Sequence, residues 1–201
     1  MYARRLFSDC VVHMGEALAL LELDSVAGGL SALDTLVKRA AVNVLEANLV
    51  EPGKFLILFE GGVAEVKECH AVVLEQYSAQ LMADMLLPMV HEAVVAGLRG
   101  KENLGAPDTL GVVEGADVAT TLLAADKAMK DAAVQLCGIR VATGLAGRAY
   151  FVVSGVQHDV EASVAAACGV LEDRLHRSEV IPRPHNEMVA WLLRPAPFRV
   201  G

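Results

Sequence analysis

The sequence predicts an α+β protein built from two similar domains, each with a four-stranded antiparallel sheet and two helices on one face. Two observations lead to this prediction. Most of the chain repeats at a spacing of about 92 to 94 residues, and both repeats show the element order β-α-β-β-α-β. That order is typical of ferredoxin-like folds. Because solenoid repeats span only about 20–50 residues, a repeat of this length indicates two tandem domains.

Four short motifs carry the repeat and keep their order in both halves. Glu22 with residues 26–27 returns as Glu114 with residues 118–119, the segment 34–42 returns as 126–134, 59–63 returns as 153–156, and 88–91 returns as 182–185. The 201 residues therefore divide into two units of roughly 85 residues, a size that can fold independently.

In the first half, the run 17–23, which is apolar up to Glu22, predicts a strand. Apolar residues at helical spacing from Val26 to Ala40 predict a helix with Ser25 as N-cap. The β-branched run 42–50 and the run 54–60 flank the turn Glu51-Pro52-Gly53 and predict a hairpin. A helix at 63–77, a strand at 83–87 and a short helix at 91–98 follow.

The second half repeats this order, with strands expected at 109–115, 134–142, 149–154 and 178–181 and helices at 118–132, 156–174 and 186–193. Residues 1–16 have no counterpart and are interpreted as an N-terminal extension in which Met14 is an alternative start. The expected boundaries are 17–99 for the first domain, 100–108 for a polar linker, 109–194 for the second domain and 195–201 for a C-terminal tail.

Composition argues against a membrane or nucleic-acid protein. The mean hydropathy of +0.43 is high, yet the longest stretches without a charged residue are only ten residues long, whereas a spanning helix needs about 20 apolar residues. We expect the apolar surplus to lie in cores and in large subunit interfaces. The net charge is −8 and aromatic residues make up 4%, so no basic aromatic patch for nucleic acid is expected.

The remaining signals indicate a non-catalytic protein in a reducing cytoplasm. Asp9 interrupts any signal-peptide core, and the four cysteines show no C-x-x-C spacing, so buried free thiols are expected. The common catalytic and nucleotide-binding motifs are absent from the sequence. No cofactor and no metal site are expected.

The repeated motifs resemble those of a known family. The pattern Asp-x-x-x-Lys-x-Ala at 34–40 and 126–132, the Gly-Val that opens the second helix of each half, and the ending 180–185 are similar to the bacterial microcompartment (BMC) shell domain. The resemblance covers about residues 17 to 194. It is closest to the tandem-domain shell proteins of propanediol-utilisation compartments, with both domains in the unpermuted order.

This resemblance implies a homotrimer that forms a flat pseudohexagonal tile and packs edge to edge with other shell proteins around enzymes, in a cytoplasmic microcompartment. It also implies a central pore for small metabolites. The pore would be lined by the turn between the second and third strands of each domain, here Val50, Glu51, Pro52, Gly53, Thr143, Gly144, Leu145, Ala146 and Gly147.

Glu51 stands where the iron–sulfur-binding tandem relative has a cysteine, so the resemblance does not extend to a cluster, whose usual ligands are thiolates. Three Glu51 side chains around one axis would instead form an acidic ring, and such rings favour cations. The alternative is that Glu51 faces solvent or pairs with Lys54.

The family pattern also implies a set of tile-edge residues, namely Lys38, Lys130, Arg183 and His185. Met89 stands at the position of Arg183 in the first repeat, so we expect two unequal edges. Ordinary exposed lysines and a structural hydrogen-bonding role for His91 and His185 are the alternatives. A trimeric ferredoxin-like sensor of nucleotides or other small molecules is the rival function, with the turn 144–148 as its nearest approach to a phosphate loop.

Overall fold

The computed structural model describes residues 16–101, 107–142 and 144–192. Its first domain contains β1 (Ala17–Leu23), α1 (Val26–Arg39), β2 (Asn43–Val50), β3 (Lys54–Gly61), α2 (Val63–Tyr77), β4 (Leu81–Pro88) and α3 (Glu92–Leu98). The second contains β5 (Thr109–Gly115), α4 (Val118–Asp131), β6 (Gln135–Val141), β7 (Ala149–Gly155), α5 (Gln157–Leu171), the 3-10 turn η1 (Glu172–Arg174), β8 (Leu175–Pro182) and α6 (Asn186–Leu192).

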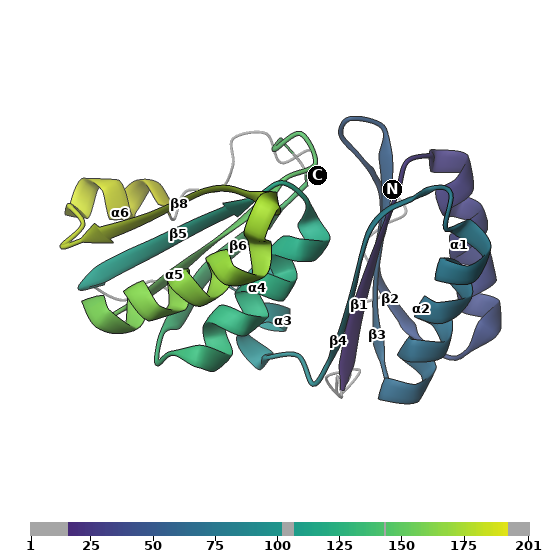
Figure 1. Ribbon diagram of the computed structural model, residues 1–201, viewed down its shortest axis with the longest axis horizontal. Helices are drawn as coiled ribbons and strands as arrows, with labels where there is room; N and C mark the ends of the chain where they lie inside the picture. Colours follow the sequence, from purple (N-terminus) through teal and green to yellow (C-terminus); the bar gives the residue numbers. More distant parts are fainter. Residues whose placement is uncertain (1–15, 102–106, 143, 193–201) are drawn as a thin grey trace, which may run out of the picture.

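Each domain has one antiparallel four-stranded sheet. The strand orders are β2-β3-β1-β4 in sheet 1 and β6-β7-β5-β8 in sheet 2. Helices α1 and α2 cover one face of sheet 1, and α4 and α5 cover one face of sheet 2 (Figure 1). We call the opposite face of each sheet its outer face. The predicted tandem α+β fold is confirmed.

The alternation of side chains along β1 explains how sheet 1 is buried on both sides. Ala17, Ala19, Leu21 and Leu23 belong to the core beneath α1 and α2, whereas Leu18 and Leu20 belong to a second core on the outer face. All seven residues of β1 are buried. Strands buried on both faces are mostly apolar instead of alternating, and residues 17–21 of β1 show this pattern.

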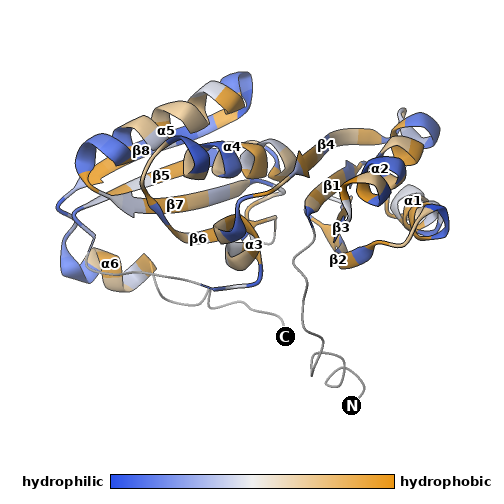
Figure 2. Ribbon diagram, turned by 90° about the horizontal axis from the view of Figure 1, so that it is seen from below, coloured by the Kyte–Doolittle hydropathy of each residue, from blue (hydrophilic) through white to orange (hydrophobic). Residues whose placement is uncertain are grey.

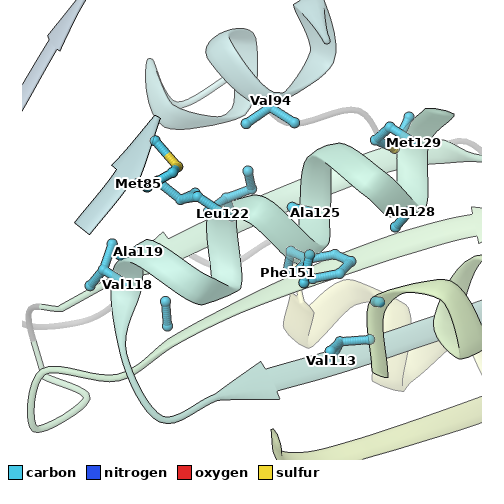
Figure 3. Close-up of a cluster of buried hydrophobic side chains, with 14 of the residues drawn as sticks. Met85, Val94, Val113, Val118, Ala119, Leu122, Ala125, Ala128, Met129 and Phe151 are labelled. Atoms are coloured by element: carbon cyan, nitrogen blue, oxygen red, sulfur yellow. The ribbon is translucent and has the colours of Figure 1, made fainter. Parts of the chain in front are cut away.

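The second core runs through both domains. It joins outer-face residues of sheet 1, such as Leu20 and Met85, to Leu122 of α4 and to Phe151 of β7. Figure 3 shows Met85, Leu122 and Phe151 in this core. The contact between the domains is therefore continuous with the core of the second domain. Figure 2 shows mixed hydrophilic and hydrophobic colouring along α1 and α2, typical of helices with one apolar face.

The largest differences between the predicted and the observed boundaries lie at the end of α5 and the start of β8. Helix α5 ends at Leu171, because Glu172 has φ 47° and turns the chain into a short 3-10 segment. Strand β8 then begins at Leu175, although the sequence predicted a strand only from residue 178. The residues 176–179 are His-Arg-Ser-Glu, and their polarity hides a strand that pairs on one side only. Within the described ranges, no helix is long and apolar enough to cross a membrane.

Candidate functional site

The contact between the domains, which we call the junction, is formed by α4 lying on the outer face of sheet 1. Val118 and Leu122 of α4 are fully buried, and Met129 is nearly so. Met85 of β4 and Val94 of α3 lie against this helix (Figure 3). One face of α4 forms the junction, because its apolar positions 118, 122, 125 and 129 lie on a single stripe of the helix.

Glu22 is a fully buried carboxylate of the junction. It lies next to the last residue of β1, and its Oε1 accepts hydrogen bonds from the backbone amides of Val118 (2.8 Å) and Ala119 (2.9 Å). Its Oε2 lies 3.2 Å from Lys54 Nζ. The first amides of a helix have no partner within the helix and carry partial positive charge, so a carboxylate satisfies them well. Burial nevertheless raises the pKa of Glu22, against the opposing effects of the Ala119 amide and Lys54.

Asp126 forms the polar contact at the other end of α4. Its Oδ1 accepts a hydrogen bond from the amide of His91 (2.7 Å) and its Oδ2 accepts one from Lys130 Nζ (2.6 Å). Lys130 Nζ also donates to the carbonyl oxygen of Met89 at 2.9 Å. The second Asp-x-x-x-Lys motif therefore ties α4 to the segment that follows β4.

Helix α3 crosses from the first domain onto the second. It follows β4 in the chain but packs over β6 and beside α4. An added Cβ at Gly97 would lie only 3.1 Å from Leu136 and 3.3 Å from Ile139. His91 caps α3 by accepting a hydrogen bond from the Ala93 amide at its Nδ1 (3.2 Å), which agrees with the structural role considered for it.

The two predicted pore turns lie side by side. Gly147 has φ 76°, and a Cβ there would come within 2.5 Å of the carbonyl oxygen of Glu51. Glycine alone satisfies both the backbone angle and the close approach. The Gly53 amide donates to the Val50 carbonyl (3.0 Å), which closes the first turn. Glu51, Pro52, Gly53, Gly144 and Ala146 are exposed, whereas Val50 and Gly147 are buried and Leu145 is half-buried.

A family model described as the BMC domain matches residues 17–90 and again residues 109–184. The chain belongs to the BMC domain family. This BMC protein is 35% identical over 178 residues to the bacterial microcompartment shell protein PduT of Citrobacter freundii, covering 87% of the chain and 96% of that protein. It is thus a shell protein of the tandem type.

Two solved structures have a similar fold. A microcompartment protein from Desulfitobacterium hafniense matches with a TM-score of 0.77 and 33% identity, over 87% of this chain and 98% of that one. A fused permuted hexameric shell protein from the RMM microcompartment matches with a TM-score of 0.58 and 21% identity, over 77% and 83% of the two chains. The second likeness concerns the fold alone.

The predicted edge residues of the BMC protein occupy different surroundings. Lys38 is exposed and pairs with Asp34 at 2.6 Å, whereas Lys130 makes the junction contacts described above. Arg183 is exposed with φ 48°, like Met89 with φ 59°. His185 is exposed, and its Nδ1 accepts a hydrogen bond from the Glu187 amide (3.3 Å). Thr143 of the predicted pore lies outside the described residues.

The residues at the turns do not fit an iron–sulfur cluster. Glu51 offers a carboxylate there, while the usual ligands are thiolates. Of the cysteines in the described ranges, Cys69 lies on α2, Cys137 on β6 and Cys168 on α5, so none lies on a turn. Burial raises the thiol pKa of Cys69 and Cys137, as expected for unreactive core thiols.

Sequence reasoning found Glu22 and Glu114 as a repeated residue but assigned them no role. The available signal was a carboxylate kept in both repeats at the end of an apolar strand, four residues before a Val-Ala pair. The structure places that pair of the second repeat, not of the first, against Glu22.

Proposed function

We propose that three copies of this BMC protein close into a ring of six domains, and that this ring is a structural, non-catalytic tile with a central pore in a microcompartment shell. One observation carries the proposal. The face that α4 buries in the junction has an exposed counterpart on α1. Val26, Leu30 and Val37 of α1 are 37%, 55% and 48% exposed, whereas the equivalent Val118, Leu122 and Met129 of α4 are 0%, 0% and 8% exposed.

A second copy supplies the surface that α1 lacks. Within the chain, the outer face of sheet 1 covers α4, so the outer face of sheet 2 is the matching partner for α1 of the next copy. A contact between two different surfaces of the same chain gives a closed ring when its rotation closes. With two domains per chain, three chains would give six similar junctions, three within chains and three between them.

Helix α6 lies on that outer face in the single chain. Its Met188, Val189 and Leu192 pack against Leu110 and Val152 of sheet 2, on the side opposite α4 and α5 (Figure 1). The equivalent helix α3 instead crosses onto the neighbouring domain. Closing the ring therefore requires α6 to leave sheet 2. It would then lie over β2 of the next copy, as α3 lies over β6 within the chain.

Measuring the mass in solution tests the ring directly. We expect three times 21.3 kDa, about 64 kDa, by light scattering at micromolar concentration in physiological salt. The ring would carry three times −8, or −24 charges, whose repulsion salt screens beyond about 8 Å. A stable monomer under these conditions would contradict the proposal. Discrete trimers that bind nucleotides tightly and never form sheets in electron micrographs would favour a sensor instead.

The pore prediction concerns Glu51, which is exposed on the turn beside Gly147. Lys54 pairs with Glu22 of the junction at 3.2 Å and not with Glu51. Three Glu51 carboxylates should make the pore prefer cationic or neutral polar metabolites to anions. Glu51→Gln keeps the shape and should raise anion passage at low salt, measured as solute flux through reconstituted tiles. Equal anion flux in both proteins would show that Glu51 does not line the path.

The edge prediction compares two equivalent positions in the repeats. We expect Arg183→Ala to reduce the formation of sheets in electron micrographs while leaving the trimer mass unchanged, because Arg183 is an exposed cation at the proposed edge beside His185. Met89→Ala is the matched control and should have a smaller effect. Lys38 and Lys130 belong to the same proposed edge, but Lys130 also serves the junction. Normal sheets from Arg183→Ala would remove this edge assignment.

A further inference from the structure

Three polar contacts of the junction within the chain join residues that have counterparts in the other repeat. Glu22 accepts from the amides that open α4, Asp126 accepts from the His91 amide, and Lys130 donates to the Met89 carbonyl. The counterparts are Glu114 for Glu22, Asp34 for Asp126, Lys38 for Lys130, Val26 and Ala27 for Val118 and Ala119, and Arg183 and His185 for Met89 and His91.

Among the described residues, no side-chain carboxylate accepts from the first amides of α1 as Glu22 does for α4. In α4, Asp117 accepts from the Thr120 amide (2.7 Å), and Glu22 takes the two amides before it. In α1, Ser25 Oγ accepts from the Gly28 amide (3.2 Å). The amides of Val26 and Ala27 are among the first four of the helix, for which helix geometry provides no internal acceptor.

Glu114 lies near the end of β5 in sheet 2, at the position equivalent to that of Glu22 in sheet 1. It pairs with Arg148 (2.8 Å), as Glu22 pairs with Lys54, and His176 lies 3.8 Å away. Unlike Glu22, its side chain is 30% exposed in the single chain. Glu114 thus has the position and the cationic neighbour of Glu22, but not the helix N-terminus.

We propose that Glu114 of one copy accepts hydrogen bonds from the Val26 and Ala27 amides of the next copy and so supplies the buried charged contact of the junction between chains. This inference rests on the proposed ring. Each copy then provides the carboxylate at one of its ends and the helix N-terminus at the other, so neither site is complete in a single chain.

The opposite end of α1 supports the same pairing. Asp34 and Lys38 correspond to Asp126 and Lys130 and would meet the His185 amide and the Arg183 carbonyl of the adjoining copy. The backbone that presents these groups has the same shape in both repeats. Met89 and Arg183 have φ 59° and 48°, and their amides donate to the carbonyls of Glu16 (2.6 Å) and Asp108 (2.7 Å).

The test measures association and amide protection for Glu114→Ala, Glu114→Gln and a control. The control, Glu161→Ala, removes one exposed carboxylate from α5, away from the proposed junction. In sedimentation velocity across a dilution series, Glu114→Ala should raise the trimer dissociation concentration about tenfold or more, as expected when charged hydrogen bonds are lost. Glu114→Gln keeps an acceptor oxygen, so its trimer dissociation concentration should lie between those of Glu114→Ala and the wild type.

Site-resolved hydrogen exchange provides the second measurement. The amides of Val26 and Ala27 should be protected in the wild-type trimer and in Glu161→Ala, and should exchange faster in Glu114→Ala. A wild type that never associates would overturn the ring itself. A wild type that is trimeric, with Glu114→Ala equal to it in both measurements, would overturn the role of Glu114 and leave the ring intact.

Discussion

Glu22→Ala should lower the free energy of unfolding of the single chain by about 3–5 kcal/mol, the range found when one partner of a buried ion pair is removed. The substitution leaves the amides of Val118 and Ala119 buried without their acceptor and leaves Lys54 without its carboxylate. Glu22→Gln should cost much less, because its amide oxygen can accept from both backbone groups. Denaturant unfolding of the two variants, at concentrations below association, measures the difference. Equal losses for Ala and Gln would show that charge, not the acceptor oxygen, is what the junction needs.

The pH dependence of the same pair has a definite sign. Burial raises the pKa of Glu22 above its ordinary value of 4.5, so the folded chain binds this proton more tightly than the unfolded chain. Tighter proton binding adds to the free energy of unfolding. This contribution is fully present below about pH 4.5 and is lost as the pH rises through the folded-state pKa of Glu22. Gln does not titrate. We therefore expect the difference in unfolding free energy, wild type minus Glu22→Gln, to fall as the pH rises from 4.5. A rise in this difference would contradict a raised pKa of Glu22.

Leu30→Asp should abolish the trimer while leaving the single chain nearly as stable as the wild type. Leu30 is 55% exposed in the chain, so the substitution costs little there, but in the ring it would place a charge within an apolar contact. The equivalent Leu122 is fully buried, and Leu122→Ala should destabilise the chain itself by about 2–5 kcal/mol. Sedimentation velocity and denaturant unfolding, run on both variants, separate the two effects.

Ser31→Asp is the control for the added charge. Ser31 neighbours Leu30 on α1 but hydrogen-bonds Tyr77 of α2 (2.9 Å), so it faces away from the proposed contact. It should associate like the wild type. If Leu30→Asp also associated like the wild type, α1 would not be the surface that meets the next copy.

Local sequence patterns were sufficient for most of the elements. The apolar run of β1, the helical spacing in α1 and the Pro-Gly turn after β2 each report the immediate environment of a few neighbouring residues, and the predicted strand 17–23 agrees with β1 (Ala17–Leu23). The patterns were weakest at β8, where polar residues 176–179 are in a strand, and at Glu172, where a positive φ ends α5. In both places the pairing of β8 with β5 decides the backbone conformation, although the local residue types do not favour it.

Sequence patterns predicted two copies of one α+β domain, the positions of most strands and helices, and the family. Only the tertiary structure decided that Glu22 meets the amides of residues 118 and 119, that Lys130 is held by Asp126 and Met89, and that α3 covers β6. The physical reason is that a repeating pattern reports whether a side chain is buried, whereas its partner depends on how two domains pack. The two copies of one motif can therefore have different surroundings, as the buried Glu22 and the partly exposed Glu114 do.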